Sequence, residues 1–579
     1  MARLFHPYSN PTDTERDTDN IQMSFLKKIL PTTNSTYTSR EIIGWLWRVW
    51  RDNMTQATLN AVIDVAEVAV SLSQVAAVKN AIDVASGYRD GSIYWAVGII
   101  ALLILARFAL NIASIWIKNI LGIKAQNRMQ QKMLDRILRS EWHGKEDHHS
   151  GDVMNRLEQD VQTIMKFLTE TIPSTLGTLV MFVGAFLFLM SMDSRLAMII
   201  VAMIPVFFGI SKIYVTQMRR LSREVRQTDS EVQSLLQETV QNRMLVKVME
   251  NDQMMVDKLE DVHSTLRQKV AKRASFSVFS SFIIQLGFSC GYLVAFLWSA
   301  IRLSNHTLTF GGMTAFLQLV SKIQSPARQL MKFAPAIVQA FTSAERLMEL
   351  EESPLEEQGD SIRMEGNLGI RLNDVSFQYA DGDHPVIDHI SFDFLPGTCT
   401  AIMGETGSGK TTLTRMLLGL LRPTSGSATI YNNKVEHDIS PLLRCNLVYV
   451  PQGNTLMSGT IRENLLMGNA NATEEEMTEA LKTACADFVL SLPEGIDSPC
   501  TEDGGGLSEG QAQRIAVARA LLRNRQIMIF DESTSALDMN TEKQLLHNIL
   551  STKDKTVIFI THRKAVVDYC DHILTVENT

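Results

Sequence analysis

Four long apolar runs place the strongest constraint on the fold of this 579-residue chain. They cover residues 93–117, 172–192, 196–215 and 276–301. A helix that crosses the hydrocarbon core of a bilayer needs about 20 mostly apolar residues. One such run could be a buried core helix of a soluble protein, but four in one region predict a helical domain within a membrane.

Two further candidate spans, residues 53–78 and 310–332, contain polar residues that recur every three or four positions. This spacing places them on one face of a helix. The first face carries Asn60, Asp64, Glu67, Ser71 and Gln74, and the second carries Gln318, Ser321, Lys322, Ser325 and Gln329. Because a carboxylate facing lipid is costly, both faces are predicted to line a polar passage. The alternative for residues 53–78 is a soluble amphipathic helix.

Basic residues between the six spans predict their orientation. Residues 118–171 carry about nine Lys and Arg and residues 212–275 about twelve, whereas the two short links after residues 192 and 301 carry about one each. Cytoplasmic loops are enriched in these residues, so both long segments and both termini are expected in the cytoplasm. The polar tail at residues 1–40 lacks the apolar core of a signal peptide. The Trp- and Arg-rich segment at residues 45–51 predicts an interfacial helix.

Charge and cysteine content exclude several classes of protein. The net charge of −8 gives no reason to expect nucleic acid as a partner. The six cysteines include no Cys-x-x-Cys pair, and none lies before residue 290. This pattern argues against a disulfide framework or a zinc site and is typical of a reducing compartment.

After an acidic linker at residues 351–360 the chain has the pattern of a soluble α/β protein, and it contains a G-x-x-x-x-G-K-[ST] motif. The motif lies between a predicted strand at residues 400–403 and a predicted helix at 413–421. Its glycines let backbone N–H groups surround phosphate oxygens at a helix N-terminus. The predicted ATP-binding residues are Gly404, Glu405, Thr406, Gly407, Ser408, Gly409, Lys410, Thr411 and Thr412. Lys410 is expected to contact the β- and γ-phosphates and Thr411 to hold Mg²⁺.

A second predicted strand, at residues 527–530, ends in the two carboxylates Asp531 and Glu532. Asp531 can hold Mg²⁺, directly or through water. Glu532 is placed to polarise the water that attacks the γ-phosphate. Two solvated acids at a strand end would be unremarkable alone, but beside the phosphate-binding loop they predict a hydrolytic site.

Residues 507–514, Leu-Ser-Glu-Gly-Gln-Ala-Gln-Arg, resemble the signature motif of ATP-binding cassette (ABC) proteins, and Ala-Arg-Ala-Leu follows at residues 518–521. Other motifs match in order over residues 370–577: Tyr379 is similar to the aromatic that stacks on adenine, Gln452 to the Q-loop glutamine, Asp538 to the D-loop aspartate and His562 to the switch histidine. Residues 459–464 are typical of the exporter branch. The resemblance gives Gln452 and His562 roles beside Glu532 in catalysis, and gives Gln452 a role at Mg²⁺.

This resemblance implies a fold of six transmembrane helices, all α, followed by an α/β P-loop NTPase. The expected domains are a tail at 1–40, a transmembrane domain at 41–335, a helical end and linker at 336–362 and a nucleotide-binding domain at 363–579. The resemblance also implies a half-transporter that dimerises, with ATP and Mg²⁺ between the P-loop of one chain and Ser508, Glu509, Gly510 and Gln511 of the other. Hydrolysis would drive alternating access, through cytoplasmic tips near residues 142–153 and 239–252 that dock on the cassettes.

The implied activity is outward movement of an amphipathic lipid, drug-like molecule or peptide across a bacterial inner or plasma membrane, with the nucleotide-binding domain in the cytoplasm. The partner could be a second copy or a sibling half-transporter. An ATP-gated channel or regulator is the competing class. Asp64 and Glu67 motivate a cationic or polar-headed cargo, although Lys322 could instead neutralise one of them.

Two positions depart from the usual family pattern. Glu509 stands where the signature motif usually has glycine, and we expect its carboxylate to point away from phosphate. Residues 502–504, Glu-Asp-Gly, resemble the exporter X-loop, with Thr501 where glycine is common.

Overall fold

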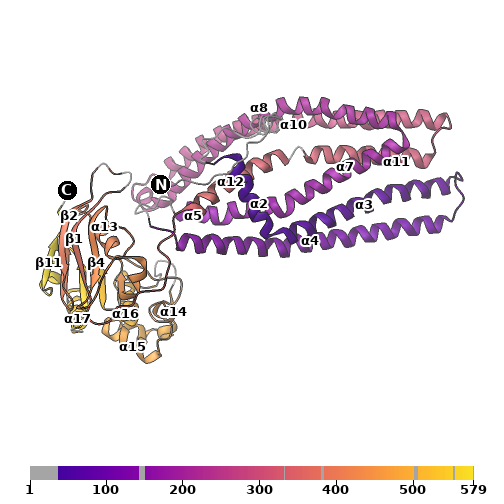
Figure 1. Cartoon of the computed structure of the whole chain (residues 1–579). Helices are drawn as coiled ribbons and strands as arrows, with labels where there is room; N and C mark the ends of the chain where they lie inside the picture. Colours follow the sequence, from indigo (N-terminus) through magenta and orange to yellow (C-terminus); the bar gives the residue numbers. More distant parts are fainter. Residues whose placement is uncertain are drawn as a thin grey trace, which may run out of the picture. The chain divides into compact units, whose positions relative to one another are not determined.

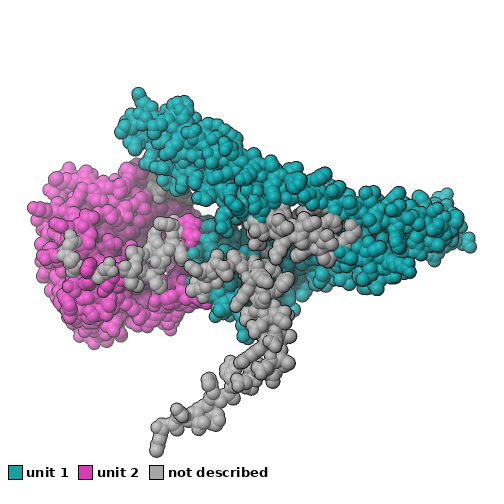
Figure 2. Space-filling view, turned by 90° about the horizontal axis from the view of Figure 1, so that it is seen from above, with its two compact units in different colours: residues 1–133, 154–350 teal, residues 134–153, 351–579 magenta. Residues whose placement is uncertain are grey.

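The computed structural model describes residues 37–142, 150–330, 333–379, 382, 384–500, 506–551 and 554–577. The chain divides into two compact units (Figure 2). Unit 1 comprises Met1–Met133 with Met154–Leu350, and unit 2 comprises Leu134–Val153 with Glu351–Thr579. The sequence places residues 134–153 within the expected transmembrane domain, whereas the structure groups them with the cassette in unit 2. The X-loop at residues 501–504, most of the N-terminal tail and part of the first cytoplasmic tip lie outside the described residues.

Long helices make up the membrane part of the chain (Figure 1). They are α2 (Ser39–Asp52), α3 (Met54–Ala85), α4 (Ile93–Leu138), α7 (Ile172–Met192), α8 (Ser194–Gln241), α10 (Asp252–Ser304), α11 (Phe310–Leu330) and α12 (Phe333–Glu352). Shorter elements are α5 (Ser150–Asn155), the π-helix η1 (Arg156–Asp160), α6 (Val161–Lys166), the π-helix η2 (Phe167–Thr171) and α9 (Arg243–Val248).

Among the described residues, four helical stretches are long and apolar enough to cross a membrane: Met54–Ala85, Ile93–Leu138, Gly151–Met192 and Asp252–Ser304. The other two predicted spans form helices within α8 and α11, and the count of six membrane crossings remains a prediction. α4, α8 and α10 contain 46, 48 and 53 residues. At about 1.5 Å per residue they are about 70–80 Å long, far more than the roughly 30 Å of a hydrocarbon core.

Small residues let α7 approach α3 closely. A Cβ atom at Gly184 would lie 2.6 Å from Leu72 Cδ1, and one at Gly177 would lie 3.0 Å from Asp64 Cβ. Glycine at helix contacts is typical of membrane proteins, where packing replaces the hydrophobic effect as the source of association. Around these contacts α3, α7, α8, α10 and α11 bury an apolar cluster whose largest member is Phe316.

The cassette in unit 2 contains two main sheets (Figure 1). An antiparallel sheet has the order β2 (Ile387–Phe394), β1 (Gly369–Phe377), β4 (Ser425–Tyr431) and β5 (Glu436–Asp438). A parallel sheet has the order β11 (His572–Thr575), β3 (Cys399–Met403), β10 (Thr556–Ile560), β9 (Ile527–Asp531) and β6 (Leu447–Val450). The short strands β7 (Gly459–Thr460) and β8 (Pro499–Cys500) pair with each other.

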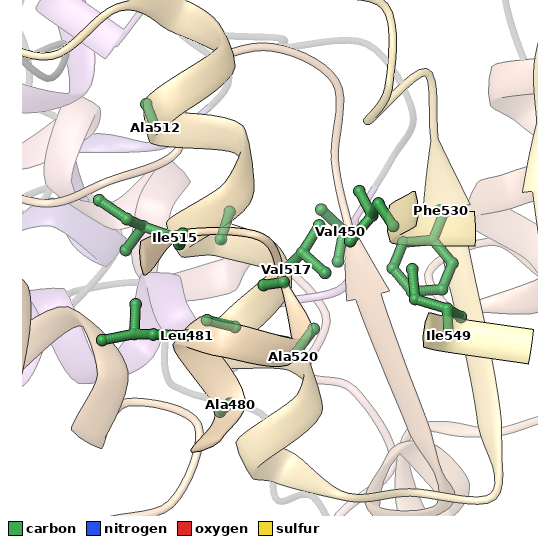
Figure 3. Packing of buried hydrophobic residues seen from close by; sticks show 14 of the residues in the cluster. Val450, Ala480, Leu481, Ala512, Ile515, Val517, Ala520, Phe530 and Ile549 are labelled. Atoms are coloured by element: carbon green, nitrogen blue, oxygen red, sulfur yellow. The ribbon is translucent and has the colours of Figure 1, made fainter. Parts of the chain in front are cut away.

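The helices of the cassette are α13 (Lys410–Leu417), α14 (Ile461–Leu466), α15 (Glu474–Thr483), α16 (Glu509–Arg523), α17 (Met539–Leu550) and α18 (Lys564–Val567), with 3₁₀ turns η3 (Pro441–Asn446), η4 (Asp487–Ser491) and η5 (Gly495–Asp497). The inner strands β3, β10 and β9 are buried on both faces, because α15, α16 and α17 cover one face and α13 with the antiparallel sheet covers the other. Figure 3 shows one such core, where Val450 and Phe530 of the sheet share a cluster with Ile515 and Val517 of α16 and with Leu481 of α15.

The segment Leu134–Val153 belongs to unit 2 because it contacts the cassette. The N–H of Glu141 donates to the carbonyl of Pro354 at 2.8 Å. The guanidinium carbon of Arg415 lies 5.7 Å from the centre of the Trp142 ring. Glu141 and Trp142, which follow α4, therefore contact the chain's own cassette.

Candidate nucleotide site and membrane pocket

The order of the parallel strands brings four separate motifs together. The P-loop follows β3, His562 follows β10 after one residue, Glu532 follows β9, and Gln452 follows β6. These four strands are neighbours in the order β3-β10-β9-β6 and run parallel. Their carboxyl ends therefore lie along one edge of the sheet, where α/β proteins generally bind ligands.

The P-loop is shaped for phosphate. Gly407 and Gly409 both have φ of 93°, which favours glycine, and Gly409 caps α13. The ammonium of Lys410 folds over the loop and donates to the carbonyls of Gly404 and Glu405, each at 2.7 Å. Burial lowers the pKa of Lys410, an effect that the neighbouring Glu532 and Asp531 oppose.

Asp531 lies at the buried end of β9. The Tyr449 hydroxyl on neighbouring β6 donates to Asp531 Oδ2 at 3.0 Å. Burial raises the pKa of Asp531 and also that of Tyr449. The role of Tyr449 was not predicted, although its position three residues before Gln452 places it at the end of the adjacent strand.

The carboxylate of Glu532 contacts two of the predicted catalytic residues. Gln452 Nε2 donates to Glu532 Oε2 at 2.6 Å, and His562 Nε2 lies 3.1 Å from Glu532 Oε1. Glu532 also has a φ of 44°, in the left-handed region that non-glycine residues rarely adopt. Strained backbone of this kind occurs where the surrounding structure fixes a functional group, and here the N–H of Glu532 donates to the Ile560 carbonyl at 2.9 Å.

Two other predicted site residues, Tyr379 and Asp538, have defined contacts. The Tyr379 hydroxyl lies 3.0 Å from Thr412 Oγ1, and its ring packs edge-on against Phe377. Tyr379 is therefore beside the P-loop helix. Asp538 caps α17 by accepting from the N–H groups of Asn540 and Thr541, each at 3.1 Å.

The signature motif starts a helix whose N-terminus is exposed. Ser508 and Gln511 form a capping box at the start of α16, in which Gln511 Oε1 accepts from the Ser508 N–H at 2.8 Å. Glu509 is exposed on the first turn. Gly510 is buried, and a Cβ there would lie 2.6 Å from the Ala536 carbonyl oxygen.

We therefore expect Gly510→Ala to destabilise the cassette. The added methyl must displace backbone near the D-loop, and overpacking of this kind costs about 1–3 kcal/mol. For a domain of this size the midpoint of its unfolding transition should fall by about 3–10 °C, as measured by scanning fluorimetry of the purified protein. Gly382→Ala is the matched control, because its nearest contact is an ordinary 3.4 Å. An unchanged midpoint for Gly510→Ala would contradict the packing argument.

A polar pocket of about 470 Å³ lies among α3, α4, α7 and α11 in unit 1. The structure places Asp64, Glu67 and Lys322 along it, together with Arg107. Gln318 is not among its lining residues. The polar faces of α3 and α11 that were expected from the sequence thus line one pocket. The sequence did not indicate that α4 also contributes to its lining, through Arg107.

Asn60 does not line a passage as expected. Its side chain is completely buried, and its Nδ2 donates to the Thr169 carbonyl at 2.7 Å. Thr169 lies in the π-helix η2, where the wider turn changes the regular pattern of backbone hydrogen bonds. The polar side chain at this position therefore satisfies the backbone of a neighbouring helix, which no single-helix pattern reveals.

The carboxylates of the pocket have basic partners on α4. Lys118 Nζ lies 3.2 Å from Asp64 Oδ1, and Arg107 Nε lies 3.6 Å from Glu67 Oε1. Neither cation was proposed from the sequence. Their spacing of eleven residues, about three helical turns, puts both on one face of α4 and could have indicated them.

Comparison with known proteins places the chain in a family. Residues 58–326 match the ABC transporter transmembrane region, and residues 387–535 match the ABC transporter cassette. The chain belongs to the ABC transporter family. With one transmembrane region fused to one cassette, it is a half-transporter of the exporter type.

The ATP-dependent lipid A-core flippase of Chromobacterium violaceum is 26% identical over 551 residues, 93% of each chain. The lactococcin-A transport/processing ATP-binding protein LcnC of Lactococcus lactis is 30% identical over 437 residues, which cover 74% of this chain and 60% of that protein. A bacterial Atm1-family ABC exporter with ATP bound matches in structure with a TM-score of 0.74 and 21% identity, covering 90% of this chain and 93% of that chain. The predicted fold class is confirmed, and the protein is an ATP-hydrolysing exporter integral to the membrane.

Proposed function

We propose that this half-transporter pairs with a second half-transporter and moves an amphipathic molecule outward across a bacterial inner or plasma membrane. One observation carries the proposal: Glu532, Gln452 and His562 are in contact beside an intact P-loop. This chain therefore has the groups that hydrolysis needs within its own cassette, so a second copy could complete the transporter. Relatives named as a lipid A-core flippase and a lactococcin-A transport protein support an amphipathic cargo.

Each residue of the site has a defined task in this proposal. Lys410 leaves the loop carbonyls to contact the β- and γ-phosphates, while the N–H groups of residues 407–412 surround the phosphate oxygens. Glu532 accepts a proton from the attacking water, and Gln452 and His562 hold its carboxylate in place. The N-terminus of α16 begins at the exposed Ser508 and continues through the backbone of Gly510, and it offers a hydroxyl, backbone N–H groups and a positive dipole end to the γ-phosphate of the partner's site.

The oxygen donors of the site fit Mg²⁺. Asp531 supplies one carboxylate, Thr411 a hydroxyl at the start of α13, and Gln452 an amide oxygen. Mg²⁺ is typically held by one or two carboxylates together with substrate phosphates and water, so a fuller set of protein ligands is not needed. When bound, the ion neutralises the charge that develops on the phosphates.

The second cytoplasmic tip suits contact with a cassette. α9 and the residues around it expose large apolar side chains: Val240, Met244, Leu245, Val248 and Met249. The cassette has a groove of about 340 Å³ whose lining includes Leu418, Leu420 and Tyr449. We propose that, in the assembled dimer, the α9 tip of a half-transporter binds in this groove of a cassette. Closure of the two cassettes would then move α8 and α10.

Proteoliposomes containing the purified chain and a trace of fluorescent phospholipid test the proposal. ATP added to the cassette side should move label away from that leaflet, measured as loss of quenching by dithionite. Two differently tagged copies should also co-purify if the chain forms a homodimer. ATP-induced ion current without movement of any labelled amphiphile would instead identify a gated channel and overturn the proposal.

A further inference from the structure

In and beside the polar pocket of unit 1, three cations stand against two carboxylates. Its two carboxylates, Asp64 and Glu67, are each paired with a cation of α4, Lys118 and Arg107 respectively. Arg107 lines the pocket and Lys118 does not, and a third cation, Lys322 of α11, also lines it. The acidic face that suggests a cationic cargo in the sequence is thus neutralised from within the chain, and one basic residue is left over.

The hydrogen-bond partner of Lys322 within the described part of the chain is neutral. Its half-buried ammonium donates to the Ser71 hydroxyl, and no described carboxylate forms an ion pair with it. An ammonium has three donor hydrogens, so Ser71 leaves capacity for a further acceptor. The charge of Glu67 reaches Lys322, but Glu67 is already paired with Arg107, whose own charge repels Lys322. A half-buried cation that shares one carboxylate with a second cation is incompletely neutralised in a membrane domain, which favours an anion at this position.

Neutral donors and apolar surface surround this ammonium. Ser325 and Gln329 lie one and two turns beyond Lys322 on the same face of α11, and both line the pocket. Val68, Met181 and Pro326 also line it and offer apolar contact. A cation flanked by hydroxyl and amide donors fits an oxyanion, and the apolar members fit the start of an acyl or alkyl chain.

We propose that this pocket receives the anionic headgroup, a phosphate or carboxylate, of an amphipathic molecule, with Lys322 as its counter-ion. The proposal rests on the exporter function proposed above and names the class of its cargo. Lys322 is then a residue that determines specificity, while Asp64 and Glu67 keep the two α4 cations in place and set the net charge of the pocket.

Binding and ATPase stimulation by three amphiphiles with the same chain length test this inference: an alkyl phosphate, an alkyl phosphocholine and an alkyl trimethylammonium. With the full chain in phosphatidylcholine nanodiscs, the alkyl phosphate should be half-saturating at the lowest concentration. Lys322→Gln should raise that concentration about 10-fold or more, because it removes a charge-assisted hydrogen bond. Lys322→Arg should restore most of the affinity.

Lys79→Gln is the matched control, because Lys79 lies on α3 but does not line the pocket. It should leave the response to all three amphiphiles unchanged. Equal affinity of wild type and Lys322→Gln for the alkyl phosphate, or a preference of the wild type for the cation, would overturn the inference. Competition by inorganic phosphate at equal concentration would show a free-anion site and also overturn it. ATP-dependent movement of neutral lipid in the same preparations would leave the exporter function intact in either case.

Discussion

Replacing Glu532 with glutamine is expected to lower the rate of ATP hydrolysis at least 100-fold while ATP still binds. The substitution keeps the size and hydrogen-bonding reach of the side chain but removes the carboxylate that we propose accepts a proton from water. General-base catalysis contributes about 10²–10⁴-fold to rates of this kind. Release of phosphate from the purified chain in nanodiscs measures the effect, and retention of a fluorescent ATP analogue measures binding.

Glu475→Gln is the control for this prediction. Glu475 is exposed on the first turn of α15, and it belongs to none of the motifs of the nucleotide site. The Glu475→Gln variant should hydrolyse ATP at the wild-type rate. A Glu532→Gln protein that hydrolyses ATP at more than a tenth of the wild-type rate would show that another group activates the water.

Replacing Lys410 with methionine is expected to weaken ATP binding about 10–100-fold, which reduces hydrolysis as a consequence. Methionine fills a similar volume, so the buried position remains packed while the ammonium is lost. A hydrogen bond to a charged group contributes about 1.5–3 kcal/mol, and 1.4 kcal/mol corresponds to about a tenfold change in affinity. Equilibrium binding of a fluorescent ATP analogue measures the loss directly.

The pair of substitutions separates binding from chemistry. Glu532→Gln should bind nucleotide and fail to hydrolyse it, whereas Lys410→Met should fail at binding. Lys434→Met, at an exposed residue after β4, serves as the control for the loss of a lysine. Wild-type affinity in Lys410→Met would mean that the loop N–H groups alone hold the phosphates.

The cassette was largely predictable because its motifs have local geometry. A strand, a glycine-rich turn and a helix follow one another within residues 399–417, and each is specified by its own residues. The contact between Gln452 and Glu532 was harder to predict from the sequence. These residues are 80 positions apart, and the parallel pairing of β6 with β9 brings them together.

The membrane half was predictable in its helices and only partly in its pocket. The repeat of polar residues placed Asp64 and Glu67 on one helix face and Lys322 on another, since a helical period depends only on the chain itself. All three residues line one pocket in the structure, and their role in a passage stays a prediction. The same repeat misplaced Asn60, because whether a polar side chain faces a cavity or a neighbouring carbonyl depends on the helix packed against it.

The sequence by itself determined the long apolar helices, the glycine-rich loop and the set of side chains that are predicted to be catalytic. Each of these depends on residues close together in the chain, through backbone conformation and side-chain period. Only the tertiary structure decided which charges are paired in the membrane pocket and which one is left over. Those pairings depend on the register between α3, α4 and α11, which is set by packing over the whole unit and leaves no mark on any single segment.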